Sequence, residues 1–202
     1  MNNKVQNILL GVLAVGLIGI TVAYAALTQQ LTINGTAKVA ATKWDVHFAK
    51  LSDGAATGYA STDGKTLAIA GDKSTSIEGN LGTLRAPGDT ITYTFDIANA
   101  GNINAVIDSV TGGQGVTCTS TTQSVADAVC KELTYSIKYT DGNSIAKGDK
   151  LAKATNSTTP TTKNVTLTLT YKATAESASL PSEDVTVTAN GMTINYVQDA
   201  NN

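Results

Sequence analysis

The chain has few of the residues that carry catalysis, metal binding or nucleic-acid binding. Its 202 residues include one histidine, two cysteines and one tryptophan, and charged residues make up only 15%. One histidine excludes an H-E-x-x-H zinc site, and the sequence has neither G-x-S-x-G nor a glycine-rich phosphate loop. The net charge of −2 provides no basic stripe for phosphates or anionic lipid. We therefore expect no enzyme, no cofactor, no metal and no nucleic-acid partner.

The N-terminal segment has the three parts of a secretory signal. Lys4 precedes an uncharged apolar run, Ile8–Val22, which ends at the small residues of Ala23-Tyr24-Ala25. This order predicts a hydrophobic signal helix in residues 1–25, recognised at Ala23 and Ala25 and cut before Ala26 by a signal peptidase. The alternative is an uncleaved anchor, because the apolar run is nearly long enough to span a bilayer. We expect contact with a membrane only through the uncleaved leader.

The segment that follows the leader alternates between apolar and polar residues. Every second position is apolar at Leu31, Ile33, Ala37 and Val39, and Gly35 has the same parity. A period of two predicts a half-buried strand over residues 27–39, which we call the arm. Cleavage of the leader would leave the arm free at the new N-terminus. It would then either form the first strand of its own domain or pair with another molecule.

The remaining sequence reads as one all-β domain. Alternating patterns recur over residues 44–49, 91–97, 133–139, 165–171 and 192–196, with shorter ones at 66–70, 103–107 and 185–187. Turn signals separate them, including Pro87-Gly88-Asp89 and Asn190-Gly191, and the second of these predicts a hairpin. A polar stretch over residues 143–163 predicts a loop. The spacing predicts that residues 26–202 form a single antiparallel β-sandwich of the jelly-roll type.

Two further features concern cross-linking and helices. Cys118 and Cys130 are the only cysteines, and in an exported chain an even pair predicts a disulfide, with two unpaired thiols as the alternative. Between them, Ser124 is the expected N-cap of a short helix through Val129. The domain should therefore contain one or two short helices. His47 stands alone on the polar face of a predicted strand, so we interpret it as a surface residue.

Three blocks of sequence together resemble a known family. The leader ends in a small-aromatic-Ala site and leads directly into a strand that finishes Asn34-Gly-Thr-Ala-Lys-Val39. Further on come Pro87-Gly-Asp-Thr-Ile-Thr-Tyr-Thr-Phe95 and Asn99-Ala-Gly-Asn-Ile103. In these features the chain is similar to the TasA/camelysin family of exported bacterial proteins, whose leader is removed by a SipW-type signal peptidase. The leader departs from that family in its tyrosine and its few basic residues, and the C-terminal third matches only in character.

The resemblance implies a jelly-roll subunit of extracellular biofilm-matrix fibres. It also implies that the arm of one subunit completes the sheet of the next by donor-strand exchange, so the expected partner is a second copy of the chain. The groove-filling residues would be Leu31, Ile33, Ala37 and Val39, with Gly35 allowing close backbone approach. Camelysins have also been called metallopeptidases, but this chain lacks a histidine-based zinc motif. The alternative from another class is a monomeric surface module that binds carbohydrate or protein.

Overall fold

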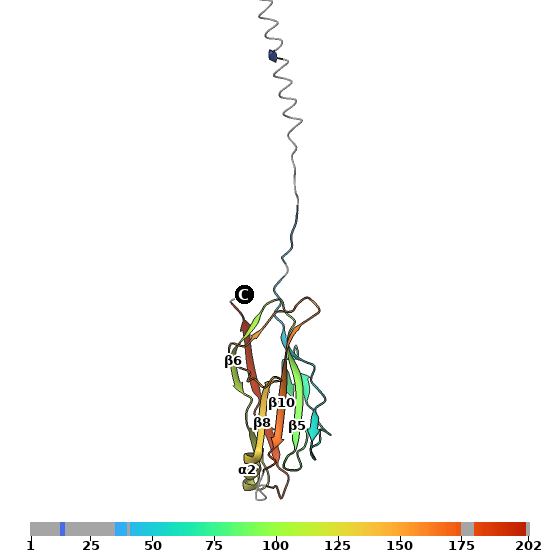
Figure 1. The fold of residues 1–202 in the computed structure, drawn as a ribbon, viewed down its shortest axis with the longest axis vertical. Helices are drawn as coiled ribbons and strands as arrows, with labels where there is room; N and C mark the ends of the chain where they lie inside the picture. Colours follow the sequence, from blue (N-terminus) through green and yellow to red (C-terminus); the bar gives the residue numbers. More distant parts are fainter. Residues whose placement is uncertain (1–12, 15–34, 40, 175–179, 201–202) are drawn as a thin grey trace, which may run out of the picture. The chain divides into compact units, whose positions relative to one another are not determined.

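The computed structural model describes residues 13–14, 35–39, 41–174 and 180–200 (Figure 1). The chain divides into two units, residues 1–40 and 41–202. The second unit, here called the β domain, contains every strand that the structure describes. All of these strands pair antiparallel. The prediction of an all-β, antiparallel domain is therefore confirmed.

The larger sheet has five strands in the order β1-β5-β10-β8, with β2 pairing beside β1 on β5. Their bounds are Val46–Ala49 for β1, Ala55–Thr57 for β2, Thr90–Asn99 for β5, Leu133–Tyr139 for β8 and Thr161–Tyr171 for β10. Figure 1 shows β5, β10 and β8 side by side. These strands are rich in Thr, Tyr, Val and Ile, which favour a pleated surface. Their alternate side chains form one buried face.

The second layer is made of two small antiparallel sheets that continue one another. It consists of β6 (Ala105–Gly112), β7 (Val116–Thr119), β9 (Lys150–Leu151), β11 (Thr186–Ala189) and β12 (Met192–Gln198). β11 pairs with β7, β12 pairs with β6, and β9 covers the other edge of β6. Ile107 and Leu151 of this layer share one hydrophobic core with Ile91 and Val165 of the larger sheet. The two layers therefore face each other as in a β-sandwich.

The predicted hairpin at Asn190-Gly191 is wrong. β11 and β12 do not pair with each other, because Ala189 lies opposite Val116 and Met192 lies opposite Gly112. The chain therefore continues in one direction through Asn190-Gly191, which forms a kink between two parts of one strand. A Cβ on Gly112 would collide with the carbonyl oxygen of Gly191, so the backbones approach too closely at the kink for a larger residue.

The smaller elements refine several predicted boundaries. β3 (Ala68–Ala70) and β4 (Ser76–Glu78) pair as a separate ribbon. β1 begins at Val46, so Trp44 lies before it. The predicted loop over residues 143–163 contains β9 and the start of β10. The helix of the β domain, α2, spans Gln123–Glu132.

The arm does not form the predicted strand within the part that the structure describes. Residues Gly35–Val39 have no strand assignment, all five are exposed, and the Val39 side chain is 93% exposed. Of the leader, the structure describes Leu13 and Ala14, which are helical. None of the helices in the described ranges combines the length and the apolar character needed to cross a membrane.

Candidate functional site: an open apolar groove

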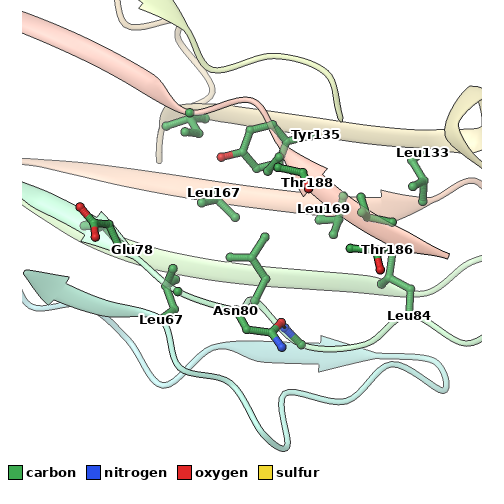
Figure 2. A pocket seen from close by; sticks show the side chains of 18 of the residues that line it. Leu67, Glu78, Asn80, Leu84, Leu133, Tyr135, Leu167, Leu169, Thr186 and Thr188 are labelled. Carbon is green, nitrogen blue, oxygen red and sulfur yellow. The ribbon is translucent and has the colours of Figure 1, made fainter. Parts of the chain in front are cut away.

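A groove of about 1100 Å³ runs along the β domain between the two layers. Its floor comes from β5, β8 and β10, and one wall is the β11–β12 edge from Val185 to Ile194. The other wall is Leu67 together with residues 75–85. Figure 2 shows Tyr135, Leu167 and Leu169 from the floor, Leu67 and Leu84 from the second wall, and Thr186 and Thr188 from the edge strand. The volume exceeds the roughly 300–1,000 Å³ of typical small-molecule sites.

The floor is apolar because period-two strands send alternate side chains inward. Residues that line it include Phe95, Leu133, Tyr135, Leu167 and Leu169, which are at most 9% exposed. Phe48 of β1 meets Phe95 edge to face, with ring centroids 5.5 Å apart. Such pairs are worth about 0.5–1.5 kcal/mol beyond their buried area. The floor is therefore a closely packed apolar surface.

The β11–β12 wall is an unpaired strand edge. In the sheets of the described chain, β11 and β12 have neighbours only on the β6–β7 side. β6 and β7 contribute nothing to the lining of the groove, so the groove lies along the free edge. A free edge presents backbone N–H and C=O groups that can template another strand. The inward residues Val187, Ala189, Met192 and Ile194 remain only half-buried.

The second wall is fixed by hydrogen bonds from side chains of β5 and its leading turn. The Tyr93 hydroxyl donates to the carbonyl of Leu81 at 2.6 Å. The carboxylate of Asp89 accepts backbone N–H groups from Tyr59 (2.7 Å), Arg85 (2.6 Å) and Ala86 (2.9 Å). These bonds hold the chain around residues 81–86 against the larger sheet.

Asp89 is charged in the folded protein despite its burial. Burial alone would raise its pKa, but the N–H groups of Arg85, Tyr59 and Ala86 outweigh that effect and hold the pKa below 3.8. Its position follows from the predicted Pro87-Gly88 turn, in which Asp89 N–H donates to the Ala86 carbonyl and Gly88 has a φ of 95°. The turn was predicted; its role in fixing the groove wall was not.

One end of the groove is closed by α2, and we call it the α2 end. Val129 of α2 lines it, and a disulfide joins Cys130 of α2 to Cys118 of β7, with a Cα–Cα distance of 5.8 Å. Cys118, Ala126, Val129, Leu133 and Tyr171 form a second small core there. The disulfide therefore ties the helix to the second layer beside the groove.

The predicted helix cap at Ser124 is wrong. The helix begins at Gln123, its N-cap is Thr122, and the Thr122 side chain makes no capping bond. Instead, Glu183 accepts the Thr122 backbone N–H at 2.7 Å and the Ser120 hydroxyl at 3.0 Å. The Thr122 N–H, together with the Ser120 hydroxyl, lowers the pKa of Glu183. A partner 61 positions away in sequence cannot be found from a local capping pattern.

The opposite end of the groove is more aromatic, and we call it the Trp44 end. A hollow of about 220 Å³ is lined there by Trp44, His47 and Tyr196, and it shares Phe48, Thr75 and Ile194 with the groove. His47 is half-buried rather than a free surface residue, and its Nδ1 lies 2.8 Å from Asp45 Oδ1. Burial, assisted by the charge of Asp149, raises the pKa of Tyr196 to about 12. Trp44, Phe48 and Tyr196 therefore line this end with uncharged aromatic rings.

Apart from Cys118 and Cys130, which form the predicted disulfide, the sequence-predicted site residues fall into two groups. Ala23, Ala25, Ala26, Leu31 and Ile33 lie outside the described residues. Gly35, Ala37 and Val39 are described and exposed.

The groove itself was not predicted. Leu81 and Leu84 belong to its wall, yet they follow a turn-rich stretch in which the sequence shows only short strand patterns. Their apolar character in a polar segment was the available signal.

Over residues 13–14, 35–39, 41–174 and 180–200, no group of three or more His, Cys, Asp or Glu side chains could hold a metal ion. No family model, no curated protein and no solved structure matches the chain.

Proposed function

We propose that the protein is a secreted structural subunit of extracellular matrix fibres that assembles by donating its arm to the groove of a neighbouring copy. The observation that carries the proposal is the groove itself, an apolar channel along an unpaired strand edge. The second layer is one strand short at this position. A strand added there would bury the half-exposed residues of β11–β12 and satisfy the free backbone groups of the edge.

The arm has the chemistry and the length of the missing strand. Its apolar residues share one parity and its polar residues, apart from Gln29, share the other, so one face would meet the groove and one the solvent. Residues 27–39 number thirteen, as does the edge from Thr186 to Gln198. Each large apolar side chain that becomes buried contributes about 1.5–3 kcal/mol. The exposure of Gly35–Val39 in the single chain is consistent with a segment that pairs elsewhere.

Assembly by this contact would propagate. The arm and the groove are different surfaces of the molecule, so the contact is heterologous and each added copy offers a new groove. The resemblance to the TasA/camelysin family, with its jelly-roll fibre subunits, agrees with this assembly. Release of the arm would require cleavage between Ala25 and Ala26, which places assembly outside the cell. In this function the protein is not an enzyme and needs no cofactor.

Export of the full chain from a bacterial host, followed by electron microscopy and N-terminal sequencing of the product, tests the proposal. We expect fibres from a product that begins at Ala26. Deletion of residues 29–39, which keeps the cleavage site, should yield monomers. Ile33→Asp should also prevent fibres, because it places a carboxylate in an apolar groove, whereas Thr32→Asp on the outer face should not. Fibres from the deletion variant would contradict donor-strand assembly.

The alternative is a monomeric surface module, and the hollow at the Trp44 end is the feature that would serve it. Trp44 is 44% exposed and offers an aromatic face of the kind that stacks on sugars. However, the hollow of about 220 Å³ is smaller than the roughly 300–1,000 Å³ of typical ligand sites. It is also continuous with the groove through Phe48 and Ile194. We therefore favour the fibre subunit.

A further inference from the structure

The edge strand changes parity at its kink, and the arm does not. Inward side chains of β11 are Val187 and Ala189, at odd positions, while those of β12 are at even positions, beginning with Met192 and Ile194. Three positions therefore separate Ala189 from Met192, where regular alternation would require two or four. The apolar residues of the arm keep odd parity throughout. If the arm paired with β11–β12 without any irregularity, the apolar side chains in one half of the arm would point away from the groove.

The opposite edge of the same strand shows how a partner accommodates this kink. There, Gly112 lies opposite Met192 and Val116 lies opposite Ala189. Three residues of that partner, Gly113-Gln114-Gly115, therefore face the two residues of the kink, and both glycines have positive φ. Because of this extra residue, the inward positions of the partner stay opposite the inward positions of β11–β12 on both sides of the kink. Glycine suits this position because a bulge needs unusual dihedral angles and close approach.

We propose that Gly35 forms the matching bulge of the arm and thereby sets the register of the donated strand. This inference rests on the proposed function. Ile33 then lies opposite Met192 and Ala37 opposite Ala189, four positions apart like Gly112 and Val116. Asn34-Gly35-Thr36 faces the kink in the place that Gly113-Gln114-Gly115 takes on the other edge, with its glycine at the central position instead of the two flanking ones.

The same register brings each of the four groove-filling residues to an inward partner. Leu31 lies opposite Ile194, and Val39 lies opposite Val187. A shift by two residues would put Gly35 beside Met192 and place the bulge on Thr36-Ala37-Lys38, which contains no glycine. Gly35 is thus the specificity-determining residue of the contact.

The direction of the strand follows from where the arm joins the β domain. The backbone N–H of Lys43 donates to the Asn102 side chain, and the Asn102 amide donates to the Ala41 carbonyl, so the β domain begins at the Trp44 end. β11–β12 runs from the α2 end to the Trp44 end, where the Asp199 N–H donates to the Asn104 carbonyl. A donor stacked on the α2 end would therefore insert its arm antiparallel to β11–β12. An arm folded back into its own groove would run parallel.

Mixed-chain disulfide trapping tests the register. Exported Thr32→Cys protein is mixed with Thr193→Cys protein, and Lys38→Cys protein with Thr188→Cys protein, so that a new disulfide can join only different molecules. Thr193 and Thr188 are solvent-exposed, and directly opposite residues of an antiparallel pair lie about 4.5–5.5 Å apart, within the range of a disulfide. Each mixture is assembled, oxidised and analysed on non-reducing gels.

We expect covalent dimers from both pairs and roughly tenfold fewer from the shifted pairs Thr32→Cys with Asn195→Cys and Lys38→Cys with Thr186→Cys. Fibres whose dimers come chiefly from a shifted pair, or from Lys38→Cys with Val187→Cys as in a register without the bulge, would overturn the inference and leave the fibre function standing. Absence of both fibres and dimers would remove the proposed function and the inference with it.

A second measurement does not depend on introduced cysteines. Gly35→Val raises the strand propensity of the arm but places a branched side chain in the bulge, so fibre yield by sedimentation should fall at least about tenfold. Thr36→Val adds no volume at the neighbouring position and should leave the yield unchanged. Equal yields from both variants would overturn the role of Gly35.

Discussion

β10 and the β11–β12 strand have the same alternating sequence character and different surroundings. β10 is paired on both edges, with β5 and β8, and its inward residues Val165, Leu167, Leu169 and Tyr171 are at most 6% exposed. β11–β12 is paired on one edge, and none of its inward residues is fully buried. Alternation therefore marks the side of a strand that faces the core. The pairing of its edges decides whether that side is buried.

The difference also explains why the groove can remain open in a stable domain. Phe48 packs on Phe95, and the Tyr93 hydroxyl binds the Leu81 carbonyl, within the single chain. The unpaired strand edge along the groove belongs to the second layer. An unpaired edge promotes aggregation of a monomer, whereas in a subunit it offers a pairing site for a strand of another copy.

The largest expected effect tests the two kinds of strand directly. Ile91→Ala in β5, which like β10 is paired on both edges, should lower the free energy of unfolding by about 2–5 kcal/mol, because it opens a cavity in a filled core away from the groove. Ile194→Ala in β12 should cost about 1 kcal/mol in the chain lacking residues 29–39, since its side chain is already half-exposed. Urea unfolding of both variants in that deletion background measures the difference. Equal losses would contradict the contrast between a finished and an unfinished strand.

In the complete chain, the order of the two effects should reverse when fibre assembly is measured instead of stability. Ile194→Ala removes the residue expected opposite Leu31, so the minimum concentration for fibre formation should rise about tenfold or more. Ile91→Ala in folded protein should change it less, because Ile91 is buried and does not line the groove. Sedimentation over a concentration series gives both values.

The sequence allowed the strands to be located, because period-two alternation is a local property. β8 was predicted with its observed bounds, Leu133–Tyr139, and the Pro87-Gly88 turn was also predicted. The all-β, antiparallel class followed from the recurrence of these patterns.

Long-range pairing could not be predicted in the same way. Asn190-Gly191 is a strong hairpin signal, yet Gly112 and Gly113 on a partner strand turn it into a kink. The capping of α2 by Glu183 depends on a contact over 61 positions. The groove lies along an edge of β11–β12 that no strand of the described chain pairs with, and a local sequence pattern cannot show that a neighbouring strand is missing.

The next largest effect concerns the disulfide at the α2 end of the second layer. Replacing Cys118 and Cys130 together by alanine should lower the free energy of unfolding by about 3 kcal/mol, because the cross-link restricts the unfolded chain. This would sharpen the comparison, since the disulfide ties α2 to the second layer and no disulfide joins strands of the larger sheet. Thermal unfolding with and without reductant measures it. Reductant should bring the wild type to the level of the variant, and a wild type insensitive to reductant would contradict the disulfide.

The smallest effect concerns the second wall, which β11–β12 faces across the groove. Asp89→Asn replaces a carboxylate that accepts three backbone N–H groups, so it should destabilise the domain by about 1–3 kcal/mol at neutral pH. Because the folded pKa of Asp89 lies below 3.8, its stabilising contribution is complete above that value and is lost as the pH falls through the folded pKa. The gap between wild type and variant should therefore stay constant from pH 7 to about 5 and close in stronger acid. Asp141→Asn on an exposed turn is the matched control and should change stability much less. A gap that widened in acid would mean that Asp89 is protonated in the folded protein, and the wall would then be held by contacts other than this carboxylate.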